Sequence, residues 1–300
     1  MALNSLSDVR PRILLLIDVR GWAFYTLAQA TKHHLSDRFQ FDILASGEKP
    51  PIDASKYDLI HVFYFGERYH LPFLDHRIRV LKSVYSFRWQ LAGLSSDDLY
   101  RMHLREAHAI SVPNRELCSL LSDLPPPVFL TPEGVDTDLF HPSGIERSGP
   151  MVAGFAGKSS DPVKQVFLLQ EACEGMCELK VADGSLSADA MPDFYRSIDI
   201  LLCSSLAEGS PRPLLEAMAT GVFPVTFPVG IARELIDHGV NGFIAEDRTA
   251  QGLRNALSWC NAHPSVLQGA SLMNPRLMVE NRRWEVVTES LADVYDSLLL

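Results

Sequence analysis

Short apolar runs recur along the chain and alternate with stretches whose apolar residues are spaced three or four positions apart. Runs of the first kind are typical of buried parallel strands, and spacing of the second kind is typical of helices. The pattern predicts strands in the first half near residues 12–18, 40–45, 57–63, 80–86, 108–112 and 127–131. In the second half it predicts strands near residues 151–156, 178–182, 198–203, 222–227 and 242–245.

Helices are predicted between these strands and at the end of the chain. The predicted internal helices cover residues 22–35, 163–174, 211–220, 230–238 and 249–261. The final stretch carries an apolar stripe with intervals of three and four residues, which is typical of an amphipathic helix. The members of this stripe are Trp284, Val287, Leu291, Val294 and Leu298. Alternating strands and helices predict the α/β class, with parallel sheets covered by helices.

A cluster of Pro, Ser and Gly at residues 141–144 separates the two series of strands. Such clusters mark loops and linkers. We therefore expect two Rossmann-like domains, a first one over residues 1–141 and a second one over residues 149–280. Residues 281–300 would form a final helix, which needs an apolar surface to cover.

Charge and cysteine usage exclude several classes of protein. The chain has 300 residues, of which 47% are hydrophobic, and its net charge of −10 argues against a nucleic-acid partner. Its 5 cysteines are odd in number and loosely spaced, which predicts free thiols. The apolar run Ile13 to Ile17 is too short for a signal peptide or a membrane span. We expect a cytoplasmic protein, and peripheral contact with the inner face of a membrane stays open.

The strongest functional signal follows the predicted strand at residues 198–203. It is the segment EGSPRPLLE, from Glu208 to Glu216. Pro211 suits the first turn of a helix, so Glu208 would lie in the strand-to-helix turn and Glu216 inside the helix. At ~1.5 Å per residue the two carboxylates are roughly 12 Å apart, about the span from a sugar across a diphosphate to a ribose. The helix start between them is an anion site.

This segment resembles the paired-glutamate motif of the retaining family 4 glycosyltransferases, which have the GT-B fold. Residues 231–246 (IARELIDHGVNGFIAE) and 191–195 (MPDFY) resemble the sequence that flanks the motif in that family. The resemblance implies that Glu208 contacts the hydroxyl groups of a donor sugar and that Glu216 binds the ribose. It also implies a cleft between the domains, and a final helix that crosses back to the first domain. The residues Gly209, Ser210 and Pro211 would line the donor site.

Two lysines follow the predicted strand at residues 151–156, which runs into a turn at Gly157, a candidate donor-binding residue. The family places an Arg or Lys here and a Lys five or six residues later, and both reach the leaving diphosphate. Lys158 and Lys164 take these positions, while Gln165 stands where the family usually has Gly. Residues 149–300 hold 11 Lys+Arg against 19 Asp+Glu, a charge of −8, so each lysine there has few substitutes. The competing interpretation is two solvated lysines at a helix start.

The first half offers weaker candidates for the site. Gly21 follows the first strand, where its backbone could approach the donor or form only a tight turn. Phe63 stands where many family members carry a His that touches the donor sugar. His61, two residues earlier, is therefore only a weak candidate for acceptor binding, and the pattern favours a partly buried histidine within the strand. Arg88 and Trp89 would follow a strand at its C-terminal end, where open α/β sheets bind ligands, and are also weak acceptor candidates.

A D-x-D pattern at Asp136 and Asp138 stands beside Gly134 and favours a turn rather than a metal site. No metal ligand set and no cofactor are therefore expected.

Together with this resemblance, the sequence predicts a metal-independent glycosyltransferase in glycan, polysaccharide or glycoconjugate biosynthesis, and the resemblance alone implies retention of anomeric configuration. It would move a sugar from a nucleotide-diphosphate donor to a hydroxyl of a glycan, lipid-linked or small-molecule acceptor. Other GT-B proteins stay open, namely a nucleotide-sugar epimerase, a phosphorylase or a non-catalytic nucleotide-binding scaffold. A nicotinamide-dependent oxidoreductase is disfavoured because the chain lacks the G-x-G-x-x-G fingerprint.

Overall fold

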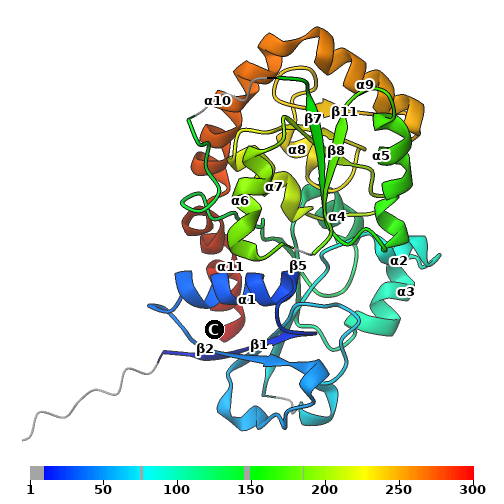
Figure 1. Cartoon of the computed structure of the whole chain (residues 1–300). Coiled ribbons are helices and arrows are strands. Elements are labelled where there is room, and N and C mark those ends of the chain that lie inside the picture. The colour runs from blue at the N-terminus through cyan, green and yellow to red at the C-terminus, as the bar shows by residue number, and fades with distance from the viewer. Residues whose placement is uncertain (1–9, 75–76, 145–148, 185) are drawn as a thin grey trace, which may run out of the picture.

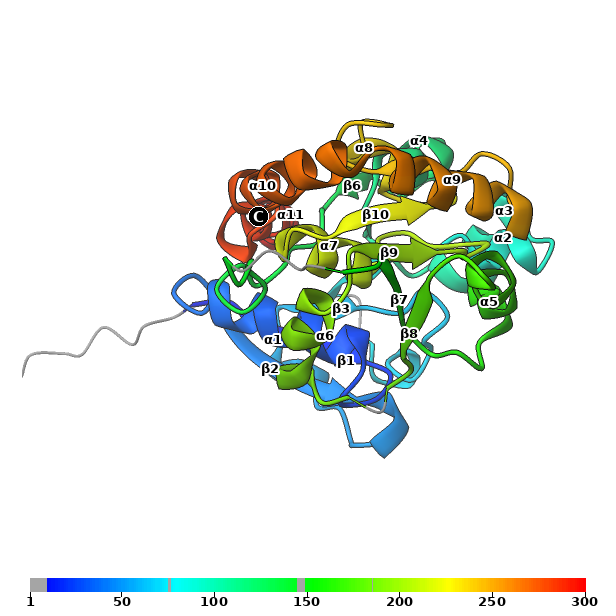
Figure 2. The same cartoon turned by 45° about the horizontal axis from the view of Figure 1, so that its top comes forward.

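The apolar runs form two parallel β-sheets, each with helices on its faces (Figure 1). The computed structural model describes residues 10–74, 77–144, 149–184 and 186–300. The first sheet has six strands in the order β2-β1-β3-β4-β5-β6. The second has five, in the order β11-β10-β9-β7-β8. Figure 2 shows β9 and β10 of the second sheet side by side, with β1, β2 and β3 of the first sheet lower in the view.

All predicted strands are present, with ends that differ from prediction by three residues or fewer. The first sheet contains β1 (Arg12–Ile17), β2 (Gln40–Ala45), β3 (Leu59–Val62), β4 (Arg79–Ser83), β5 (Ala109–Val112) and β6 (Val128–Leu130). The second contains β7 (Val152–Ala156), β8 (Glu178–Ala182), β9 (Ile200–Cys203), β10 (Phe223–Thr226) and β11 (Phe243–Ile244). The prediction of an α/β fold with two Rossmann-like domains is confirmed.

The longer helices pack on these sheets, and shorter helices fill the loops. The longer ones are α1 (Ala23–His34), α4 (Arg115–Leu121), α5 (Val166–Cys173), α7 (Arg212–Ala219), α9 (Ala250–Ala262), α10 (Pro264–Asn281) and α11 (Trp284–Leu299). The short α-helices are α2 (Arg88–Leu91), α3 (Ser96–Leu99), α6 (Met191–Arg196) and α8 (Ala232–Leu235). Single turns of other helix types are η1 (Ser46–Glu48), η2 (Ala54–Lys56), η3 (Leu71–Phe73), η4 (Tyr100–Leu104), η5 (Pro162–Lys164) and η6 (Ala188–Ala190).

Strand β1 shows why the strands appear in the sequence as continuous apolar runs. Every residue from Ile13 to Ile17 is fully buried. Ile13 and Leu15 pack into one hydrophobic cluster, whereas Leu14 and Leu16 pack into another. Since neighbouring side chains point to opposite faces, both faces of this strand are covered, as is usual for parallel sheets.

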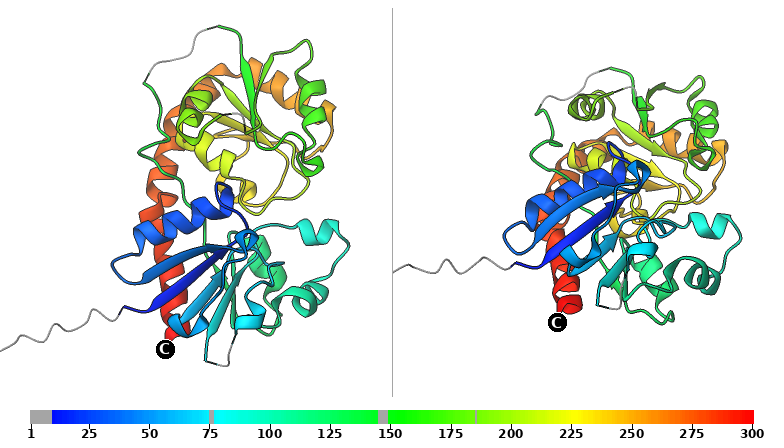
Figure 3. Two further views of the ribbon diagram at one scale, coloured as in Figure 1. Left: turned by 60° about the horizontal axis from the view of Figure 1, so that its bottom comes forward. Right: turned by 90° about the horizontal axis from the view of Figure 1, so that it is seen from below.

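The final helix crosses from the second domain to the first. Figure 3 shows α11, in red, lying along the domain that contains α1 and β1. Its residues Leu291, Val294 and Tyr295 join the same cluster as β1, so the apolar stripe covers the first domain's core. The predicted crossing is confirmed. Among the described residues, no helix has both the length and the apolar character that a membrane span requires.

His61 of β3 is hydrogen-bonded to this helix. Its Nδ1 lies 2.7 Å from the hydroxyl of Tyr295, and its Nε2 lies 2.7 Å from the hydroxyl of Ser83. The side chain is fully buried, and burial lowers its pKa to about 3. His61 is therefore a neutral structural residue, and its placement as an acceptor residue is corrected.

Candidate active site

Two loops of the second domain bring the predicted donor residues together. One follows β7 and covers residues 157–165, and the other follows the neighbouring strand β9 and covers residues 204–211. The hydroxyl of the buried Ser204 donates to the carbonyl oxygen of Lys164 over 2.7 Å. The N–H of Leu206 donates to the carbonyl oxygen of Val163 over 2.9 Å. These bonds fix the two loops side by side at the C-terminal edge of the sheet.

Lys164 and Glu208, one from each loop, form an ion pair in which Nζ donates to Oε1. Their side chains are only 18% and 14% exposed. Burial alone would lower the pKa of Lys164, but the adjacent Glu208 carboxylate outweighs burial and raises it. The structure thus places a fully charged lysine against the carboxylate that the sequence assigns to the donor sugar.

Gln165 explains why the family usually has Gly at this position. Its backbone is left-handed, with φ of 47° and ψ of 44°, between η5 and α5. This conformation costs a non-glycine residue about 1 kcal/mol, and glycine adopts it freely. The loop keeps its shape here because Ser204 holds the backbone at Lys164 and Gln165.

Glu216 lies inside α7 and is held by two side chains of the second domain. The Tyr195 hydroxyl donates to its Oε2 over 2.8 Å, and the Arg212 guanidinium lies 3.4 Å from its Oε1. Tyr195 belongs to the MPDFY segment, so the structure gives that segment a role in orienting Glu216. Sequence reasoning assigned no role to Arg212. This residue begins the helix and lies four residues from each glutamate of the motif.

The start of α7 holds polar atoms without a protein partner. Ser210 is 9% exposed, and within the described chain neither its Oγ nor the Nη1 of Arg212 has a hydrogen-bond partner. Buried polar groups are usually paired, so orphan atoms of this kind need an explanation. Their place beside Gly209 and Pro211 is the predicted donor site, where a ligand would supply the missing partners.

Lys158 lies at the junction between the domains. It follows Gly157, whose φ of 141° favours glycine, and its Nζ lies 5.6 Å from the ring centroid of Trp22. Trp22 is 57% exposed and directly precedes α1 in the first domain, following Gly21 with φ of 78°. The two predicted glycine turns therefore face each other across the junction, with Lys158 and Trp22 in contact.

Arg88 and Trp89 do not lie at the end of a strand, where the sequence predicted them. The strand β4 ends at Ser83, and both residues belong to the short helix α2. Trp89 is only 3% exposed because it packs among apolar residues of the first domain, so its placement as an acceptor residue is corrected. Arg88 is exposed and forms an ion pair with Asp161, the residue whose Oδ1 accepts from Val163 at the start of η5. Arg88 thus contacts the loop that carries Lys164.

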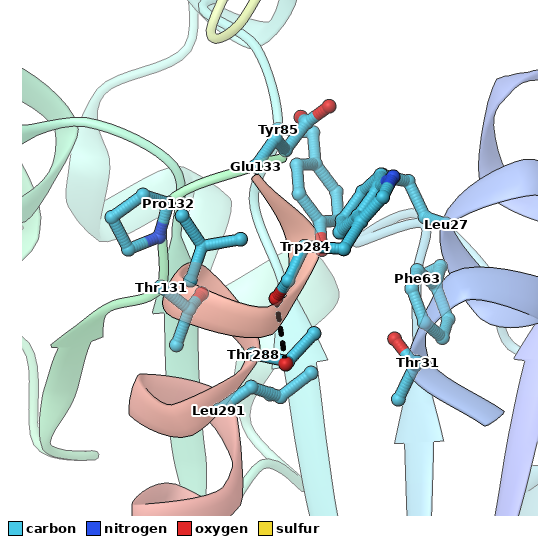
Figure 4. A pocket seen from close by; sticks show the side chains of 11 residues that line it. Leu27, Thr31, Phe63, Tyr85, Thr131, Pro132, Glu133, Trp284, Thr288 and Leu291 are labelled. Atoms are coloured by element: carbon cyan, nitrogen blue, oxygen red, sulfur yellow. Dashed lines mark hydrogen bonds between the residues drawn. The ribbon is translucent and has the colours of Figure 1, made fainter. Parts of the chain in front are cut away.

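Glu133 is a buried carboxyl group at the domain junction that sequence reasoning missed. It lines a cavity of about 20 Å³ together with Tyr85, Thr131 and Trp284 (Figure 4). Burial raises the pKa of Glu133 to about 8, although Arg212 and Arg282 act in the opposite direction. Glu133 is accordingly protonated at neutral pH. In the sequence, the segment that contains it, TPEGVD at residues 131–136, indicates a turn but not a buried acid.

The D-x-D pattern forms a turn, as predicted. Oδ1 of Asp136 accepts hydrogen bonds from the N–H groups of Asp138 and Leu139, each over 3.0 Å. Across the described residues, no group of three or more His, Cys, Asp or Glu side chains is arranged to hold a metal ion. All five cysteines are free thiols, which confirms the prediction from their spacing.

We predict that Glu133→Gln makes the protein more stable at pH 7.5 than the wild type. Between pH 4.5 and 8 the unfolded chain releases the Glu133 proton while the folded chain keeps it, so stability falls as pH rises through this window. Gln mimics the protonated acid and removes this loss, which amounts to about 2–4 kcal/mol near pH 7.5. Urea unfolding at pH 4.5 and 7.5 measures the difference.

The control for this measurement is Glu280→Gln, which changes an exposed carboxylate. It should leave the difference between the two pH values as in the wild type. If Glu133→Gln behaves like this control, Glu133 is ionised in the folded protein and the assignment of a neutral buried acid is wrong.

Comparison with known proteins agrees with this geometry. The family model described as glycosyl transferases group 1 matches residues 153–262. No curated protein sequence matches the chain. Among solved structures, sucrose-phosphate synthase from Thermosynechococcus elongatus is similar with a TM-score of 0.80 at 15% identity, over 96% of this chain and 99% of that one.

Two further structures share the whole arrangement. Anabaena HepE in complex with UDP and glucose has a TM-score of 0.73 at 15% identity, over 96% of this chain and 100% of that one. A glycosyltransferase from Rickettsia africae has a TM-score of 0.68 at 12% identity, over 97% of this chain and 99% of that one. These likenesses establish the shared fold. The chain thus has the GT-B fold, and its residues 153–262 match the model of the glycosyl transferases group 1 family.

Proposed function

We propose that this protein transfers a sugar from a nucleotide-diphosphate donor to an acceptor hydroxyl, with retention of anomeric configuration and without a metal ion. The observation that carries the proposal is the pair of glutamates around the start of α7. Glu208 is paired with Lys164, and Glu216 is paired with Arg212. Both lie in the domain that matches the glycosyl transferases group 1 model.

The Lys164–Glu208 pair suits a site that receives an anionic ligand and a sugar together. A donor diphosphate would draw Lys164 away from Glu208, and Glu208 would then accept hydrogen bonds from the sugar hydroxyls. As the bond to the anomeric carbon breaks, the diphosphate gains negative charge. Lys164, Lys158 and the N–H groups at the start of α7 would stabilise that charge more than they stabilise the bound donor, which lowers the barrier.

The nucleotide would extend toward Glu216 on the other side of the helix start. There the carboxylate is already oriented by Tyr195 and Arg212, so it could accept hydrogen bonds from both ribose hydroxyl groups without a change in its side-chain conformation. The orphan Ser210 Oγ and Arg212 Nη1 would gain partners from the same ligand. Since HepE is described in complexes with UDP and with UDP-glucose, uridine nucleotides are the first donors to test.

The finer parts of the proposal come from the family resemblance. Retention would follow a front-face route in which the departing phosphate takes the proton of the acceptor hydroxyl. The donor is a co-substrate, and no other cofactor is proposed. The acceptor would enter from the first domain and would be a glycan, a lipid-linked sugar or a small alcohol. Such a reaction belongs to glycan or glycoconjugate biosynthesis in the cytoplasm, with the inner membrane face as one place for a lipid-linked acceptor.

A binding and turnover screen tests the proposal directly. Thermal unfolding with nucleoside diphosphates and their sugars identifies the donor, because a ligand at 100 times its dissociation constant stabilises the native state by about 2.7 kcal/mol. Transfer is then assayed with and without acceptor alcohols. Turnover that needs no acceptor would support an epimerase instead, and binding without any turnover would support a scaffold.

We predict that Glu216→Ala and Glu208→Gln affect different steps. Loss of Glu216 should weaken binding of the free nucleoside diphosphate by ~1.5–3 kcal/mol, because a charged hydrogen bond to the ribose is lost. Glu208→Gln should reduce turnover far more than this affinity. Calorimetry and initial rates measure the split, with Glu246→Ala as a control for an exposed ion-paired glutamate. Equal losses of affinity and turnover in Glu208→Gln would make Glu208 a structural residue of the loop.

We predict that Lys164→Ala lowers turnover at saturating donor by about two orders of magnitude, as removal of one donor to a developing oxyanion does elsewhere. Lys164→Arg should recover part of the rate, because the charge is restored. Lys180→Ala, which removes a lysine on β8 of the same domain, is the control. Near-normal turnover of Lys164→Ala would assign this lysine to loop stability alone.

We predict that a strong chelator leaves transfer activity unchanged. The cations around the donor site, Lys158, Lys164 and Arg212, would take the place of a metal ion on the diphosphate. The measurement compares rates in chelator with rates after added Mg²⁺ or Mn²⁺. Activity that is abolished by the chelator and restored by either ion would contradict metal independence.

A further inference from the structure

We propose that Asn114 of the first domain is a positioning residue for Glu208 of the second domain. The inference rests on the proposed function, because it assigns a role toward the donor sugar. It goes beyond that function by placing part of the donor machinery in the other domain. The argument depends on one side chain and on the backbone of the residue next to Glu208.

Asn114 is fully buried and uses both ends of its amide. Its Oδ1 accepts from the N–H of Leu117 over 2.7 Å, which caps the N-terminus of α4. Its Nδ2 donates to the carbonyl oxygen of Gly209 over 2.8 Å. An aspartate or serine would cap the helix equally well. Aspartate has no donor, and serine would have to accept from Leu117 and donate to Gly209 with a single atom, whereas the amide of Asn114 makes the two bonds with separate atoms.

The backbone at Gly209 packs closely against the first domain. A Cβ at position 209 would collide with the carbonyl oxygen of Tyr85 and would lie 3.1 Å from Pro113, both in the first domain. From the other side, the N–H of Ile231 donates to the same Gly209 carbonyl oxygen over 3.0 Å. Gly209 is thus enclosed between the two domains, and its peptide orientation is fixed by two donors.

The residue before Glu208 is held by the first domain as well. Ala207 is buried in a cluster made of first-domain residues, including Phe87 and Leu117. Next to Asn114, the N–H of Arg115 donates to the carboxylate of Glu234 over 2.7 Å. Contacts between domains therefore flank Glu208 on both sides in the sequence, while the Glu208 side chain itself faces Lys164.

This arrangement couples the direction of the Glu208 side chain to the approach of the two domains. When the domains separate, Gly209 loses the Asn114 donor and Ala207 loses its apolar surroundings. Glu216 is held within its own domain by Tyr195 and Arg212, so nucleotide binding does not depend on that approach. The nucleotide would therefore bind whether or not the domains are closed, and the sugar would be oriented only when they are.

The test compares Asn114→Asp with Asn241→Asp. Asparagine 241 is also buried, accepts from the N–H of Asp237 over 2.7 Å and donates to the carbonyl oxygen of Leu235 over 3.0 Å. Both substitutions keep the accepted bond, remove one N–H···O=C bond and introduce a charge. Only the first acts between the domains. Asn114→Ser is a second variant that keeps the cap of α4 without introducing a charge.

We expect Asn114→Asp to lower kcat by about tenfold and Asn114→Ser by somewhat less, while affinity for the nucleoside diphosphate changes less than about twofold. Asn241→Asp should keep kcat near that of the wild type. Small-angle scattering without ligand should show a larger radius of gyration for Asn114→Asp than for Asn241→Asp.

The outcomes separate this inference from the proposed function. Equal kcat values for the two aspartate variants, or equal radii of gyration, overturn the role of Asn114 while transfer activity stands. If the wild type turns over no donor, the proposed function fails, and the scattering comparison still decides whether Asn114 holds the domains together.

Discussion

The buried ion pair between Lys164 and Glu208 is the interaction on which the arrangement of the second domain's loops depends. Neither charge could be kept in a partly dehydrated site alone, since an unpaired buried charge is strongly destabilising. The pair requires the loops after β7 and β9 to lie side by side, and Ser204 secures that with a bond to the Lys164 backbone. The strained backbone of Gln165 is tolerated because the same contacts leave the loop no alternative path.

Charged side chains also connect the two domains at their junction. Arg88 reaches across to Asp161, and Lys158 reaches across to the exposed ring of Trp22. Each contact joins the first domain to the loop that carries Lys158 and Lys164. The first domain therefore supports the loop in which the acidic second domain carries two of its few cations.

The sequence allowed prediction of the fold and of the residues whose roles are local. Strand positions followed from apolar runs. Glu208 and Glu216 were proposed from the spacing and turn chemistry of one motif and Lys164 from the family resemblance, and the structure places Lys164 against Glu208. Asn114 and Glu133 could not be predicted in this way, because their roles arise from contacts between segments far apart in the chain. The helix α10 was missed since Pro275 lies inside it and its apolar residues form no single stripe. Trp89 was predicted at the end of a strand because the apolar residues continue past Ser83, where β4 ends, into the short helix α2.

The return of α11 to the first domain has a consequence for how the protein is made. Leu291, Val294 and Tyr295 belong to the hydrophobic core that begins with β1, so the earliest and latest parts of the chain share one core. Domains usually fold in the order of their synthesis. Here the apolar face that α11 covers belongs to elements that are synthesised long before it. The second domain lies in between, and its hydrophobic clusters draw on α9 and α10 as far as Met278, so the first domain can seal this face only after the core of the second domain has been synthesised.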